Sequence, residues 1–99
     1  MLEVELRVPG GVTAVPEVVE RMCALDGLTL TLKGALVKYP GSVHWHFKKG
    51  KQPGTLELTW WPPQKRLWFK VAQGRRATWI DETLAGLQVK IEQALSGLE

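Results

Sequence analysis

The chain has 99 residues, of which 44% are hydrophobic and 23% charged, and its single cysteine is Cys23. These values predict one globular domain over residues 1–99 and exclude a disordered chain and an internal disulfide. No apolar run is long enough to span a bilayer, and the first residues do not resemble a signal peptide, so we expect a cytoplasmic protein without membrane contact. The six prolines and the absence of asparagine are compatible with a thermophilic source.

Residues 2–8 alternate between apolar and charged side chains, which predicts a half-buried strand. A helix is expected from about residue 14 to residue 26, because Pro16 suits its first turn and Gly27 suits its end. Cys23 borders the apolar stripe of this helix and is expected to be a buried, inert thiol. The stripe consists of Val15, Val18, Val19, Met22 and Leu25.

A second strand is predicted over residues 28–38, with a bulge or bend at Gly34. Its alternation places Leu28, Leu30 and Leu32 toward the core and Thr29, Thr31 and Lys33 toward solvent. Residues 39–42 are predicted to form a turn. Three further strands are expected at about 43–48, 55–61 and 66–72.

The last helix begins near Thr78, which with Asp81 resembles a variant capping box. Its apolar residues recur at steps of four and three: Ile80, Leu84, Leu87, Ile91, Ala94 and Leu98. The predicted fold is therefore α+β with the order β-α-β-β-β-β-α, a curved antiparallel sheet with two helices packed on one face. This order is similar to that of one half of a TATA-binding-protein-like domain, although only the order of elements is shared.

Strand alternation sorts the side chains of the last three strands onto two faces. The face that the helices should cover carries Val43, Trp45, Phe47, Leu56, Leu58, Trp60, Leu67, Phe69 and Val71. The opposite face carries His44, His46, Lys48, Glu57, Thr59, Trp61, Arg66, Trp68 and Lys70. The expected registers pair residue 47 with 56 and residue 61 with 66, which places Glu57 opposite both His46 and Lys70.

Positive charge is concentrated in residues 28–79. This stretch holds ten of the thirteen lysines and arginines, both histidines and all five tryptophans, with Glu57 as its one acid. Its net charge is +9, against −6 for the rest of the chain, and this asymmetry predicts a basic surface with an acidic partner.

Exposed tryptophans among cations are typical of surfaces that bind single-stranded nucleic acid. The loops at 49–54 and 73–77 must lie at the same end of a sequential antiparallel sheet, so their cations should form one basic rim. Lys38, Lys65 and Arg66 should gather at the other end. The predicted contact residues for nucleic acid or another partner are Trp61, Trp68, His44, His46, Lys48, Lys49, Lys51, Arg66, Lys70, Arg75 and Arg76.

A protein–protein or homodimer interface is the alternative interpretation, with Trp61 and Trp68 as anchors; a loop of the chain itself could also cover them. A metal or ligand site at His44, His46 and Glu57 is a third hypothesis. The H-x-H pair is a weak motif, Glu57 has Lys70 as an expected partner, and the nearby cations oppose a dication. The sequence therefore predicts no metal and no cofactor.

No catalytic arrangement emerges from the sequence. The two serines lie in a turn and in the last helix, and no histidine lies near Cys23 in the sequence. The glycine pair at residues 10–11 lacks the spacing of a phosphate-binding loop. We therefore predict a binding domain rather than an enzyme.

Overall fold

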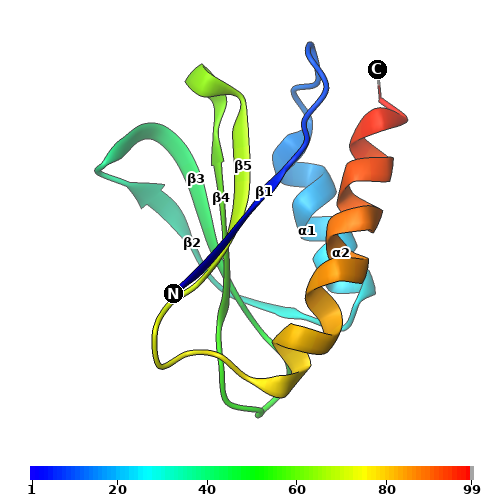
Figure 1. The fold of residues 1–99 in the computed structure, drawn as a ribbon. Coiled ribbons are helices and arrows are strands. Elements are labelled where there is room, and N and C mark those ends of the chain that lie inside the picture. Colours follow the sequence, from blue (N-terminus) through cyan, green and yellow to red (C-terminus); the bar gives the residue numbers. More distant parts are fainter. Residues whose placement is uncertain (99) are drawn as a thin grey trace.

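The computed structural model describes residues 1–98 and contains five strands and two long helices (Figure 1). In chain order these are β1 (Leu2–Leu6), α1 (Val15–Leu25), β2 (Thr29–Leu36), β3 (Tyr39–Lys48), β4 (Leu56–Trp61), β5 (Arg66–Val71) and α2 (Thr78–Ser96), with a short 3₁₀ turn at Pro62–Gln64 between β4 and β5. All strand pairs are antiparallel, in the spatial order β1-β5-β4-β3-β2. The α+β class and the order of elements are confirmed, and the first strand, whose position the sequence leaves open, pairs with β5.

The two helices lie side by side and cover one face of the sheet (Figure 1). Eight of the nine apolar side chains assigned to that face belong to the hydrophobic core, and the ninth, Val43, is partly buried and packs against it. Both predicted registers are also confirmed, since Phe47 pairs with Leu56 and Trp61 with Arg66. The uncovered face of β3, β4 and β5 therefore carries the side chains that alternation assigns to it.

The ends of the helices depart from the sequence predictions. Leu25 is 74% exposed and Leu98 is 50% exposed, so neither belongs to the apolar stripe predicted for its helix. The predicted capping box is also wrong. Ala77 is the N-cap of α2 and Asp81 accepts a hydrogen bond from Arg76 instead. Cys23 is fully buried, as predicted.

The inward and outward sets predicted for β2 are wrong beyond Leu30, because an irregularity between Leu30 and Leu32 shifts the register. Leu32 pairs with His46 and is 48% exposed, while Lys33 turns to the helix side and forms an ion pair with Glu20 of α1. One extra residue in a strand moves the side chains that follow it to the opposite face of the sheet. A second irregularity follows Gly34, where the sequence predicts one.

The turn predicted at residues 39–42 lies earlier, at residues 37–38. Strand β3 consequently begins at Tyr39, and the β2–β3 hairpin curls away from the helices (Figure 1). At the other end, the loop before β4 and the loop after β5 meet as predicted, since Thr55 N–H donates to the carbonyl of Arg75. Within residues 1–98, no helix has the length and hydropathy needed to cross a bilayer.

Candidate metal centre

Three side chains that can ligate a metal project together from the uncovered face of the sheet. His44 and His46 are two residues apart on β3 and therefore point to the same side, and Glu57 lies directly opposite His46 on β4. The strand pairing brings one ligand atom of each residue within 4.8 Å of the others. The three residues named in the sequence hypothesis are thus adjacent in space.

The ligand atoms of this trio converge on one point. His44 Nε2 lies 3.1 Å from Glu57 Oε1 and 3.1 Å from His46 Nε2. His46 Nε2 lies 3.7 Å from Glu57 Oε1. A tetrahedral Zn²⁺ ion with bonds of about 2.0–2.2 Å holds its ligand atoms roughly 3.3–3.6 Å apart. The observed spacing is therefore close to that of three ligands on one face of a tetrahedron.

Two arrangements of hydrogens fit this convergence. In one, the Thr59 hydroxyl donates to His44 Nδ1 and His44 Nε2–H donates to Glu57 Oε1. In the other, the hydrogen lies on His44 Nδ1, and the lone pair of Nε2 faces a carboxylate oxygen at 3.1 Å, which is unfavourable without a cation. In this second arrangement a metal ion would accept a lone pair from each of the three atoms.

Thr59 orients the first of the two histidines. Its Oγ1 lies 2.8 Å from His44 Nδ1, and the side chain is 1% exposed. When Nδ1 carries the hydrogen and donates it to the hydroxyl, Nε2 keeps its lone pair for the metal. A hydrogen bond to the distal nitrogen is the usual way in which proteins fix the ring of a metal-binding histidine.

Burial makes the environment of the trio suitable for a neutral imidazole. Desolvation lowers the pKa of His44 below its ordinary value of 6.5, and the charges of His46 and Lys70 act in the same direction. The carboxylate of Glu57 opposes them. Since metal binding requires a deprotonated nitrogen, a depressed histidine pKa removes part of the cost of binding.

The cations expected to oppose a metal are mostly engaged elsewhere. Lys48 donates to the carbonyl of Gly54, and Arg66 pairs with Glu5 of β1. Lys70 lies opposite Glu57 as predicted, but within residues 1–98 no ion pair joins the two. The carboxylate of the buried Glu57 interacts instead with the two histidines. The expectation that Lys70 neutralises Glu57 is therefore not met.

The β2–β3 hairpin covers the tryptophans of this face. Tyr39 packs edge-on against Trp61 and Trp68, with ring centroids 5.0 and 5.1 Å apart. The Trp61 indole donates a 2.9 Å hydrogen bond to the carbonyl of Pro40. The guanidinium of Arg66 lies over the Trp68 ring, 4.5 Å from the ring centroid. Trp68 is consequently 4% exposed, so it is not the open stacking surface that the sequence suggests.

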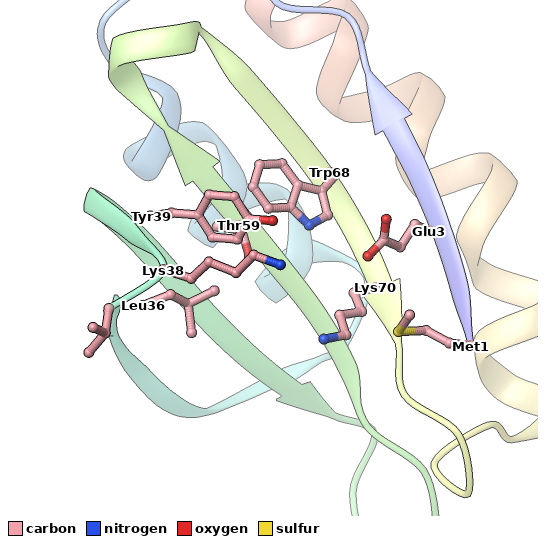
Figure 2. A pocket seen from close by; sticks show the side chains of 9 residues that line it. Met1, Glu3, Leu36, Lys38, Tyr39, Thr59, Trp68 and Lys70 are labelled. Carbon is pink, nitrogen blue, oxygen red and sulfur yellow. The ribbon is translucent and has the colours of Figure 1, made fainter.

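A cavity of about 350 Å³ opens between the hairpin and β1 (Figure 2), and the residues that line it do not include the metal trio. Thr59, Trp68 and Lys70 form its floor on β4 and β5. Lys38 and Tyr39 line it from the hairpin. Thr59 thus contacts His44 and also borders the cavity, which makes the cavity and the metal trio neighbours.

The remaining predicted contact residues lie at the far end of the sheet. They are Lys48, Lys49, Lys51, Arg75 and Arg76, on or beside the two loops that meet there. Arg76 is paired with Asp81 and Lys48 with the Gly54 carbonyl. Lys51 and Arg75 are exposed. The structure therefore divides the predicted residues into a histidine–tryptophan group and a separate basic rim.

Sequence reasoning did not assign roles to Thr59 and Tyr39. Thr59 could have been found, because alternation places it on the same face as His44 and one strand away. Tyr39 could not, because the sequence predicts it in a turn. Comparisons with protein-family models, with characterised proteins and with solved structures found no match for this chain.

Proposed function

We propose that this protein is a metal-binding domain that holds a divalent transition metal, with Zn²⁺ as the first candidate, through His44, His46 and Glu57. The observation that supports this proposal is the convergence of three ligand atoms at 3.1, 3.1 and 3.7 Å. Two imidazoles and one carboxylate form a ligand set that Zn²⁺ and the neighbouring transition metals accept. Three protein ligands leave a coordination position for water or for a further ligand.

The accessibility of the trio supports an exchangeable site rather than a closed structural one. The side chains of His44 and Glu57 are 7% and 9% exposed, whereas that of His46 is 22% exposed. Solvent therefore reaches the site from the side of His46. Structural zinc sites in proteins commonly have four protein ligands, so a site with three ligands that solvent reaches from one side supports a binding or catalytic role.

Zinc titration of the metal-free protein, purified without a histidine tag, tests the proposal. One equivalent of Zn²⁺ should bind, and Glu57→Gln should weaken binding by more than about tenfold because an anionic ligand is lost. Glu82→Gln, which changes an exposed glutamate of α2, is the matched control and should bind as the parent protein does. Absence of zinc binding, or equal affinity in the two variants, would overturn the proposal.

Nucleic-acid binding by the basic rim is a second candidate, favoured by the exposure of Lys51 and Arg75 at one end of the sheet. The cations of the rim would bind phosphates. Trp68 would not stack on bases, because its ring is covered by the β2–β3 hairpin. Affinity for a single strand should then fall steeply with salt, and Lys51→Ala should reduce the log–log slope by about one. If no polynucleotide binds at low ionic strength, this candidate fails while the metal proposal stands.

A further inference from the structure

The cavity beside the metal centre gathers more positive than negative charge. Lys38 and Lys70 border it, with Glu3 as the one carboxylate on its wall. In Figure 2 the Lys38 side chain extends from the hairpin, and the Lys70 side chain extends from β5. Within residues 1–98, the ion pairs that form do not involve Lys38 or Lys70. These two ammonium groups are therefore available to an anion.

Lys70 lies between two glutamates on the neighbouring strands and forms no ion pair with either. It lies opposite Glu57 on β4 and opposite Glu3 on β1. Residues opposite one another in a sheet have Cβ atoms about 4.5–5.5 Å apart, so the Lys70 side chain begins one strand away from the metal trio. Lys70 therefore lines the cavity and also neighbours the strand that carries Glu57.

Apart from Thr59, the rest of the cavity wall is largely apolar. Tyr39 and Trp68 present aromatic rings, while Met1, Leu36 and Val37 contribute aliphatic surface. The volume of about 350 Å³ is at the lower end of the range for small-molecule sites. An apolar wall with two cations at one side matches a small organic molecule that has an apolar body and one anionic group.

We propose that this cavity binds a small organic anion, with its carboxylate or phosphate held between Lys70 and Lys38. The apolar body lies against Tyr39 and Trp68. The lysine contacts do not rest on the function proposed above, whereas one further effect does. A divalent ion at the neighbouring metal trio adds positive charge and should strengthen binding of the anion.

Calorimetric titration with benzoate and phenyl phosphate tests this inference on zinc-loaded and metal-free protein. One equivalent of at least one probe should bind zinc-loaded protein, and its relative affinity distinguishes carboxylate from phosphate. Lys70→Met should weaken binding by about 10- to 100-fold, the loss expected for a charge-assisted hydrogen bond. Lys38→Met changes an exposed turn residue and should weaken binding without affecting folding. The control Lys65→Met, in the exposed turn before β5, should bind both probes unchanged.

The outcomes separate this inference from the metal proposal. If the protein binds one zinc ion but neither probe, the anion site is refuted and the metal site stands. If the probes bind but zinc does not, the metal proposal fails and the lysine cavity stands. Equal affinity of a probe for zinc-loaded and metal-free protein would refute the electrostatic contribution of the metal to anion binding. Zinc affinity of Lys70→Met should not fall, because Lys70 is not among the metal ligands.

Discussion

Removal of the Thr59 hydroxyl tests whether this residue orients His44 for metal binding. We expect Thr59→Val, which preserves side-chain shape and removes the hydroxyl, to weaken zinc binding about 10- to 100-fold. The reason is that His44 Nδ1 loses its partner at 2.8 Å and the ring is no longer held with Nε2 toward Glu57. This loss equals about 1.4–2.8 kcal/mol of binding free energy.

The same substitution has a separate effect on the metal-free protein. Thr59 is 1% exposed and His44 is 6% exposed, so the imidazole nitrogen left without a partner is buried. A buried polar group without a partner costs about 1–3 kcal/mol of the free energy of unfolding. Urea denaturation measures this cost, and competition with a chromophoric chelator measures the zinc affinity.

Thr59→Ser is the matched control, because serine keeps the hydroxyl and loses a methyl group. It should retain most of the zinc affinity, even if the cavity left by the methyl lowers stability slightly. If Thr59→Val binds zinc as tightly as the parent protein, Thr59 does not position His44 and our description of the site is wrong.

Three other predictions concern the hairpin, the thiol and the effect of pH. Tyr39→Ala should lower the free energy of unfolding in urea by about 1–3 kcal/mol, because two aromatic pairs are lost, whereas Tyr39→Phe should keep most of it. Burial raises the pKa of the Cys23 thiol to about 12, so Ellman's reagent at pH 8 should react with Cys23 only after unfolding. Burial lowers the pKa of His44, so on acidification below its ordinary value of 6.5 the unfolded chain takes up a proton before the folded one does. The metal-free protein should therefore keep this part of its stability above pH 6.5 and lose it progressively as pH falls further.

Each of these predictions has a result that would contradict it. Equal urea midpoints for the parent protein and Tyr39→Ala would show that the hairpin does not stabilise the uncovered face. Rapid reaction of Cys23 in the folded protein would contradict its burial. A urea midpoint that rises as pH falls from 7.5 to 5 would contradict the depressed pKa of His44.

The face of the sheet that carries the site was predictable because alternation in β3, β4 and β5 is unbroken. His44, His46 and Glu57 could therefore be placed together from sequence parity and one register assumption, the pairing of residue 47 with residue 56. Their convergence at bonding distance could not, because it depends on side-chain rotamers. The sequence also favours Lys70 as the partner of Glu57, whereas in the structure the Glu57 carboxylate interacts with His44 and His46.

Strand β2 shows why the same reasoning failed elsewhere. An extra residue near Thr31 exchanges the two faces of the strand for the residues that follow. Leu32 is therefore exposed, and Lys33 reaches Glu20 on the helix side. An edge strand tolerates such a bulge because one side has no partner to keep in register. The cover over Trp68 depends on the curl of this hairpin and on Tyr39 belonging to β3, and neither has a signal in the residue pattern.

The claim that His44, His46 and Glu57 bind a metal is tested most directly by crystallography of the zinc-loaded protein at the zinc absorption edge. We predict one anomalous peak about 2.0–2.2 Å from His44 Nε2, His46 Nε2 and a carboxylate oxygen of Glu57. A map without a peak at these atoms, from crystals whose protein binds zinc in solution, would contradict the account.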